Sequence, residues 1–124
     1  MGKKILVIDD TEADRKIVKR FLNRAGYDNI VTAENGEQGV ALAASERPDL
    51  VITDTMMPGL DGFETCRQIR AQFDKETMKI IVTTGAIDAV DAIKARKAGA
   101  DDYCVKSSSP EPIIAAVKGL IGEP

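Results

Sequence analysis

Short apolar runs recur along the chain, and each is followed by a segment in which apolar residues return at helical spacing. The runs are continuous rather than alternating with polar residues. Continuous runs are typical of strands buried on both faces, as in a parallel sheet with helices above and below it. The pattern predicts five strands, at residues 5–8, 30–31, 50–52, 80–82 and 103–105.

The segments after these runs are predicted to be helices. The first carries a one-sided apolar stripe and ends at Gly26, a residue type that commonly terminates helices. The last is preceded by Ser109, a good N-cap residue, and Pro110, which suits the first helical position. The strict alternation of strand and helix indicates a single doubly wound α/β domain over residues 1–124. The other predicted helices cover residues 36–45, 63–73 and 88–98.

The composition of the 124 residues fits one globular domain, since 44% are apolar and 30% are charged. Seventeen basic and twenty acidic residues give a net charge of −3. Binding to nucleic acid needs a strong basic excess, so we expect no nucleic-acid partner for this chain acting alone. No stretch approaches the ~18 uninterrupted apolar residues of a membrane span, so we expect no membrane association.

Two further features of the composition narrow the chemistry. The chain has no histidine, which excludes histidine-based acid–base catalysis, histidine metal ligation and a phosphohistidine on this chain. Cys66 and Cys104 are too few and too far apart for a disulfide framework or a metal knuckle, so a reducing cytoplasm is the simplest location.

Polar residues that could bind a ligand or take part in a reaction follow four of the predicted strands. Asp9 and Asp10 follow the first strand, Asp54 the third, Thr84 the fourth and Lys106 the fifth. The carboxyl ends of parallel strands meet at one edge of the sheet, where ligands of such folds bind. Three carboxylates would repel one another there unless a hard cation is present, and Mg²⁺ prefers oxygen ligands. A lysine and a hydroxyl beside that cation complete a pocket for phosphoryl oxygens.

Each of these residues also has an ordinary structural explanation. An aspartate after a strand often caps a helix or forms a turn, and a lone lysine is often a solvated surface charge. Their joint placement at four strand ends favours a functional site. No histidine, cysteine or serine is placed as a nucleophile, so a carboxylate is the natural candidate, and aspartyl phosphate is a recognised covalent intermediate.

Other α/β chemistries find less support in the sequence. No G-x-G-x-x-G follows the first strand and no G-x-x-x-x-G-K-[ST] run occurs, which leaves dinucleotide and P-loop sites unsupported. A small phosphohydrolase with Asp9 as its nucleophile is the enzymatic alternative. It is weakly supported, because Asp9-Asp10-Thr11 lacks the second aspartate of a D-x-D motif.

Four motifs together carry a resemblance to a known family. The sequence closely resembles the receiver domain of bacterial two-component response regulators, the chemotaxis-regulator-like family, from about residue 4 to residue 121. The motifs are ILVIDD at residues 5–10, DLVITDTMMPGLDG at 49–62, KIIVTTG at 79–85 and AGADDYCVK at 98–106. The resemblance implies a flavodoxin-like fold of five parallel strands in the order 2-1-3-4-5, flanked by five helices.

The resemblance also implies a metal site and a phosphoacceptor. Asp54 is the phosphoacceptor in this assignment. Asp10 and Asp54 hold Mg²⁺ directly, together with the backbone carbonyl of Met56, and Asp9 acts largely through a water. A partner's phosphohistidine, on a sensor histidine kinase or a histidine phosphotransfer protein, is the implied phosphoryl donor. The chain is then a phosphoacceptor protein that assists its own phosphorylation and dephosphorylation, rather than an enzyme.

The implied switch involves two of the strand-end residues and one aromatic residue. Thr84 and Lys106 contact the phosphoryl oxygens, and Tyr103 is the aromatic switch residue whose ring position follows phosphorylation. The surface around the fourth helix, the fifth strand and the fifth helix then changes. In this scheme the charge added by phosphorylation shifts the equilibrium between two conformations of that surface. No effector domain follows in these residues, so we expect the signal to leave through a partner protein, unless the chain is a piece of a longer one.

The sequence departs from the family pattern in two places. Ser107 follows the active-site lysine where the family usually has proline, and Gly85 follows the threonine where the family often has alanine. We expect a trans Lys106–Ser107 bond, because a cis bond before a residue other than proline costs ~2.5–4 kcal/mol. A receiver-like module that binds partners without phosphorylation is a further alternative, against which the retained Asp54, Thr84 and Lys106 argue.

The first predicted helix is rich in basic residues. In the family this helix helps to dock the kinase or the phosphotransfer protein. Glu12 and Asp14 near the start of this helix and basic residues near its end also fit a simple helix-dipole bias, so both interpretations stay open. The basic residues are Arg15, Lys16, Lys19, Arg20 and Arg24.

Overall fold

Five parallel strands form one sheet in the order β2-β1-β3-β4-β5, as expected. The computed structural model describes residues 3–85 and 88–124. The strands are β1 (Lys4–Ile8), β2 (Asn29–Ala33), β3 (Leu50–Asp54), β4 (Lys79–Thr84) and β5 (Asp102–Val105). The helices assigned in the described residues are α1 (Glu12–Arg24), α2 (Gly36–Glu46), α3 (Gly62–Gln72), α4 (Ala89–Lys97) and α5 (Glu111–Ile121).

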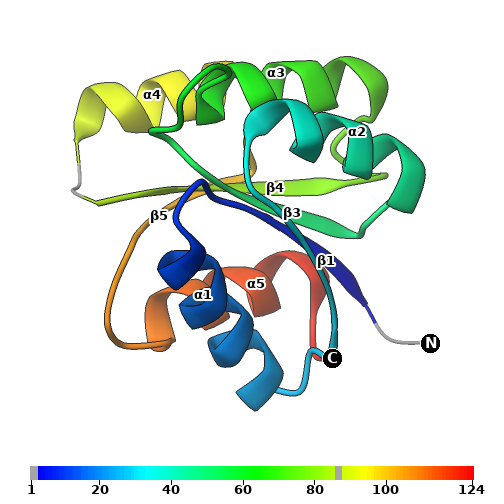
Figure 1. The fold of residues 1–124 in the computed structure, drawn as a ribbon, viewed down its shortest axis with the longest axis vertical. Helices are drawn as coiled ribbons and strands as arrows, with labels where there is room; N and C mark the ends of the chain where they lie inside the picture. Colours follow the sequence, from blue (N-terminus) through cyan, green and yellow to red (C-terminus); the bar gives the residue numbers. More distant parts are fainter. Residues whose placement is uncertain (1–2, 86–87) are drawn as a thin grey trace.

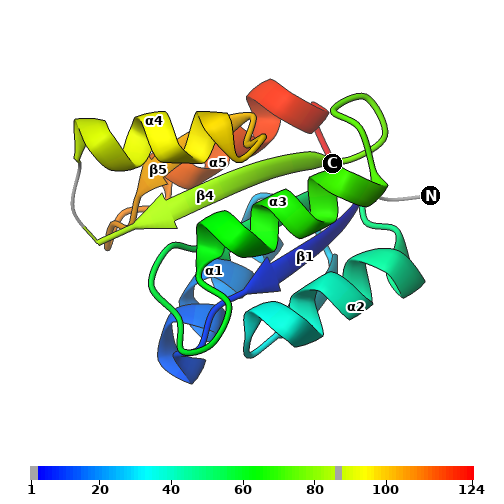
Figure 2. The same ribbon diagram turned by 90° about the horizontal axis from the view of Figure 1, so that it is seen from above.

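The sheet is the middle of three layers (Figure 1). Helices α1 and α5 cover one face, and α2, α3 and α4 lie across the other (Figure 2). All five strands pair in parallel, so their carboxyl ends share one edge of the sheet. The element order and the layers confirm the doubly wound α/β architecture expected from the alternation of strands and helices.

The core consists of two apolar clusters, one on each face of the sheet. Successive residues of a strand point to opposite faces. In β1, Ile5 and Val7 therefore pack with Leu22 on the α1–α5 face, whereas Leu6 and Ile8 pack on the face of α2–α4. The four β1 residues are at most 1% exposed. Burial on both sides explains why the apolar runs are continuous in the sequence.

Some predicted boundaries differ from the observed ones. Strand β2 runs over Asn29–Ala33, one residue before and two residues after the predicted range 30–31. It is half-exposed because it lies at the edge of the sheet. Helix α5 begins at Glu111, with Pro110 at the N-cap and no side-chain cap. Ser109 therefore does not cap this helix as expected. Its hydroxyl pairs with the Glu111 carboxylate, and its N–H donates to the Ser107 hydroxyl at 3.1 Å.

A partly buried arginine and a buried tyrosine tie distant parts of the chain together. The Arg70 guanidinium donates to the carbonyls of Gly99 (2.9 Å) and Met78 (2.6 Å) and pairs with Asp101 at 2.9 Å, which joins α3 to the residue before β4 and to the turn between α4 and β5. The Tyr27 hydroxyl donates to the carbonyl of Gly122. The last residues of the chain are therefore held against the turn between α1 and β2.

The described residues contain neither a membrane-spanning helix nor a cis peptide bond. None of the helices in residues 3–85 and 88–124 is long and apolar enough to cross a membrane. The same residues contain no cis peptide bond, so the Lys106–Ser107 bond is trans, as predicted from the missing proline.

Candidate functional site

Three aspartates meet at the carboxyl edge of the sheet. Asp9 and Asp10 follow β1, and Asp54 is the last residue of β3. One carboxylate oxygen from each of the three lies within 4.8 Å of the others. Asp9 and Asp54 are buried, at 3% and 7% exposure, and Asp10 is exposed. An all-oxygen donor set with one side open to solvent suits a hard divalent cation such as Mg²⁺.

The Asp54 carboxylate lies between a backbone donor and a lysine. Its Oδ1 accepts a hydrogen bond from the Thr55 N–H at 2.9 Å, and its Oδ2 lies 3.3 Å from Lys106 Nζ. Burial raises the pKa of Asp54 above its usual value, and the neighbouring Asp9 charge adds to this, while Lys106 opposes it. The ionised form of Asp54 is thus disfavoured by its surroundings, and a bound cation would offset that cost.

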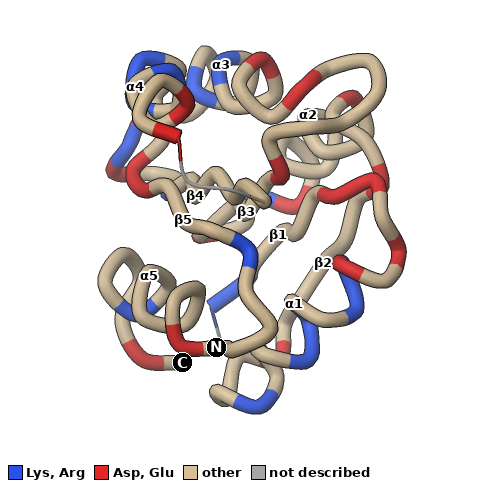
Figure 3. Tube along the Cα trace, turned by 90° about the vertical axis from the view of Figure 1, so that its left-hand side faces the viewer, with Lys and Arg blue, Asp and Glu red and all other residues tan. Residues whose placement is uncertain are grey.

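Lys106 is shared by three carboxylates. Its ammonium lies 2.7 Å from Asp14 Oδ2, 2.8 Å from Asp9 Oδ2 and 3.3 Å from Asp54 Oδ2. Burial disfavours the charged ammonium, but the hydrogen bonds to Asp14 and Asp9 outweigh burial and raise the pKa of Lys106. Figure 3 views this edge, where acidic segments that follow β1 and β3 come together with a basic segment that follows β5.

The other predicted site residues lie around this centre. Thr84 ends β4 and is 6% exposed, and its carbonyl accepts the Lys106 N–H at 2.6 Å. Tyr103 lies on β5, packs against the apolar cluster beneath α3 and α4, and has a buried hydroxyl without a hydrogen-bond partner among the described residues. Met56 lies two residues beyond Asp54, with its side chain 80% exposed. The aspartates, Thr84 and Lys106 are therefore gathered at one edge, whereas Tyr103 lies two residues before the end of β5. The roles of these residues stay predictions.

The sequence analysis did not single out Asp14 for this site. It lies in the first turn of α1, where a helix-dipole bias explained its charge. The structure instead places its carboxylate at the shortest of the three contacts to Lys106. No sequence pattern points to this contact, because Asp10 precedes α1, which begins at Glu12, and helical spacing therefore does not relate the two aspartates.

The loop after Asp54 is held by contacts that the sequence also did not reveal. A Cβ atom on Gly62 would lie 2.0 Å from the Asp54 carbonyl oxygen, so the start of α3 packs directly on the backbone of the site. The Gly62 N–H donates to the Thr55 carbonyl at 2.9 Å. Across the loop, the Leu60 N–H donates to the Glu37 carboxylate at 3.2 Å. These contacts fix the path of the segment that contains Met56.

The open α/β sheet, with an acidic cluster and a lysine at its carboxyl edge, agrees with the receiver domain that the four sequence motifs resemble. The sequence profile of the response regulator receiver domain matches residues 5–118. The chain belongs to this family, which confirms the resemblance seen in the four motifs.

Individual relatives agree with the assignment. The chain is 40% identical over 121 residues to the alkaline phosphatase synthesis transcriptional regulatory protein PhoP of Bacillus subtilis, covering 98% of this chain and 49% of that protein. Chemotaxis response regulator CheY4 of Vibrio cholerae superimposes with a TM-score of 0.88 at 28% identity, covering 98% and 100% of the two chains. The BeF3-activated DrrB receiver domain superimposes with a TM-score of 0.83 at 32% identity, covering 98% of each chain. The chain spans about half the length of the curated relatives it matches.

Proposed function

We propose that this chain is a phosphoaccepting signalling switch that takes a phosphoryl group onto Asp54 from a partner's phosphohistidine. The observation that carries the proposal is the setting of Asp54. Its carboxylate lies in a cluster with Asp9 and Asp10, and its Oδ2 is 3.3 Å from Lys106 Nζ. A carboxylate beside a cation site and a lysine has what an acceptor of a negatively charged group needs.

Phosphoryl transfer depends mainly on in-line positioning and on neutralising charge at the equatorial oxygens. An oxygen of Asp54 attacks phosphorus, the bond between phosphorus and the donor imidazole nitrogen breaks, and its electron pair stays on the imidazole. Lys106 and Thr84 would contact the phosphoryl oxygens. Asp10, Asp54 and the Met56 carbonyl would hold Mg²⁺, with Asp9 acting through a water. The bound ion would supply positive charge between the carboxylates and the phosphoryl group.

The proposed output is a change of surface near β5. Phosphorylation adds charge and acceptor oxygens at Asp54, which would draw the Thr84 hydroxyl toward it. Tyr103 would then move into the space that Thr84 leaves, and the surface of α4, β5 and α5 would change. The buried Tyr103 hydroxyl, which has no hydrogen-bond partner in the described parts of the chain, supports a ring that is free to change place.

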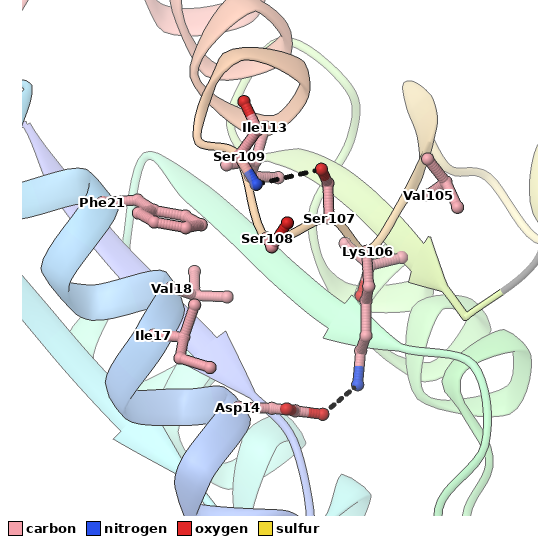
Figure 4. A pocket seen from close by; sticks show the side chains of 11 residues that line it. Asp14, Ile17, Val18, Phe21, Val105, Lys106, Ser107, Ser108, Ser109 and Ile113 are labelled. Carbon is pink, nitrogen blue, oxygen red and sulfur yellow. Dashed lines mark hydrogen bonds and ion pairs between the residues drawn. The ribbon is translucent and has the colours of Figure 1, made fainter.

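A pocket beside Lys106 supports the docking of a kinase or phosphotransfer protein. The pocket measures about 310 Å³ and lies between α1 and the segment that joins β5 to α5 (Figure 4). Its apolar wall includes Ile17, Val18 and Phe21, and Ile17 is 41% exposed. An apolar pocket next to the active-site lysine suits the end of a partner helix that carries the phosphohistidine. We place this exchange in the cytoplasm.

The effector that reads the changed surface is a separate protein or a segment outside these 124 residues. Matched relatives named as transcriptional regulators support an output at the level of transcription.

Phosphorylation followed by mapping of the modified residue tests the proposal. Incubation with acetyl phosphate and Mg²⁺ should add one phosphoryl group, detected as an intact-mass shift, and Asp54→Asn should abolish it. Modification at Asp9, or modification that persists in Asp54→Asn, would support the phosphohydrolase alternative.

A further inference from the structure

We propose that Asp14 is a positioning residue that competes with the phosphoryl site for Lys106, and so weakens the binding of a phosphoryl group at Asp54. This inference rests on the proposed function. It assigns a role to a residue of α1 that lies outside the aspartate cluster and outside the four sequence motifs.

The distances favour Asp14 over Asp54. Lys106 Nζ lies 2.7 Å from Asp14 Oδ2 and 3.3 Å from Asp54 Oδ2, so the ammonium is drawn toward α1 (Figure 4). The Asp14 contact also has hydrogen-bond geometry. An ammonium group has three N–H donors and no acceptor. Three carboxylates already surround it, so every donor has a partner before phosphorylation.

Phosphorylation introduces new competition for these donors. A phosphoryl group brings three strong acceptor oxygens and more negative charge than the carboxylate it modifies. Lys106 can reach those oxygens only by sharing or redirecting its donors, and the contact with Asp14 is the shortest of the three that hold the ammonium in place. The Asp14 carboxylate is itself a fixed negative charge that faces the same ammonium. Asp14 therefore weakens the binding of the phosphoryl group, because it competes for Lys106.

The size of the effect follows from the exposure of the pair. The side chains of Lys106 and Asp14 are 26% and 36% exposed, so solvent screens their interaction. Ion pairs of this kind shift equilibria by roughly two- to fivefold. We expect an effect of this size on phosphoryl-group affinity rather than a loss of phosphorylation.

Beryllofluoride, the group in the activated DrrB structure, is the probe, because it mimics a phosphoryl group without chemical turnover. Asp14→Asn removes the charge and keeps the size of the side chain. Its beryllofluoride dissociation constant, measured by calorimetry in excess Mg²⁺, should be roughly two- to fivefold lower than that of the wild type. The rate of phosphorylation by acetyl phosphate should rise by a similar factor.

Three matched variants separate this mechanism from a general effect of charge. Glu12→Gln makes the same charge change on the same helix, where Glu12 is exposed and pairs with Lys16 at 3.1 Å, and it should leave beryllofluoride affinity unchanged. Asp14→Glu restores the charge and should bring the affinity back toward the wild-type value. In a Lys106→Met background, Asp14→Asn should give no gain, because the effect acts through the ammonium. Circular dichroism verifies that each variant folds.

The possible outcomes distinguish a failure of the role proposed for Asp14 from a failure of the proposed phosphoacceptor function. If the wild type binds beryllofluoride and Asp14→Asn binds it equally or more weakly, the role of Asp14 is overturned and the proposed function stands. An equal gain in Glu12→Gln overturns the role as well, since the effect is then one of net charge. If neither the wild type nor Asp14→Asn binds beryllofluoride or accepts phosphate at Asp54, the proposed function fails and the inference fails with it.

Discussion

A methyl group added at Gly62 should destabilise the protein, even though alanine is a better helix former than glycine. Gly62 is the first residue of α3. Helix propensity alone predicts that Gly62→Ala stabilises by up to about 1 kcal/mol. The structure predicts the opposite, because the new Cβ would lie 2.0 Å from the Asp54 carbonyl oxygen and 2.8 Å from the Thr55 Cα.

The neighbours at Gly62 are backbone atoms, which cannot rotate away as the end of a flexible side chain can. The loop between β3 and α3 must shift, and overpacking of this kind costs roughly 1–3 kcal/mol. This cost exceeds the gain in propensity, so we expect a net loss of stability. For a domain of this size, each kcal/mol corresponds to a fall in Tm of roughly 3–5 °C. Because Asp54 is displaced, its phosphorylation should slow as well.

Gly119 in α5 provides the matched control. A Cβ at Gly119 meets nothing within 4 Å, so Gly119→Ala should stabilise by up to about 1 kcal/mol through propensity alone. Thermal and urea unfolding followed by circular dichroism measures both variants. A Gly62→Ala protein as stable as the wild type, or more stable, would show that the loop accommodates the methyl group and that the steric reasoning is wrong.

Three further predictions concern metal, pH and a partly buried ion pair. Mg²⁺ at a concentration tenfold above its dissociation constant should stabilise the fold by about 1.4 kcal/mol and raise the Tm. The rise in Tm should be smaller in Asp10→Asn. An unchanged Tm at millimolar Mg²⁺ would contradict a metal site. Burial raises the pKa of the Cys66 thiol from its ordinary value of 9.0 to about 11, so the neutral form is favoured in the folded state. The free energy of unfolding should therefore be intact below pH 9 and fall as the pH rises toward 11, more steeply in the wild type than in Cys66→Ala; equal slopes in a pH series of urea titrations would refute this. Arg70→Met should destabilise by about 3 kcal/mol, because it removes the cation from Asp101, which keeps only the Ile80 N–H among the described residues, and the donor from two backbone carbonyls; a loss below about 1 kcal/mol in urea unfolding argues against it.

The sheet could be predicted because its signal is local. An interior strand such as β3, in which every residue is buried, is apolar over most of its length and is recognisable without its neighbours. The edge strand β2 mixes apolar and polar residues, since Asn29 and Thr32 face solvent, and its extent was underestimated for that reason. The start of α5 was misplaced by one residue because Ser109 has a competing partner in Glu111.

The site divides in the same way. Residues at strand ends could be placed together from the sequence, because parallel strands bring Asp9, Asp54 and Lys106 to one edge. The contribution of Asp14 depends on how the side chain of Lys106 crosses to α1, which strand order does not determine. The close approach of Gly62 to the Asp54 carbonyl is likewise a through-space contact between two backbones. Neither contact leaves a pattern in one sequence.

The anchoring of the last residues has a practical consequence for following the switch in solution. The Tyr27–Gly122 hydrogen bond keeps the C-terminus near the edge of the sheet where the strands begin, on the side away from the acidic cluster (Figure 1). A fluorescent reporter joined after Pro124 would lie near the amino ends of the strands, at the opposite end of β3 from Asp54. Such a fusion leaves the pocket beside Lys106 open, so energy transfer to a labelled partner can report docking without blocking it.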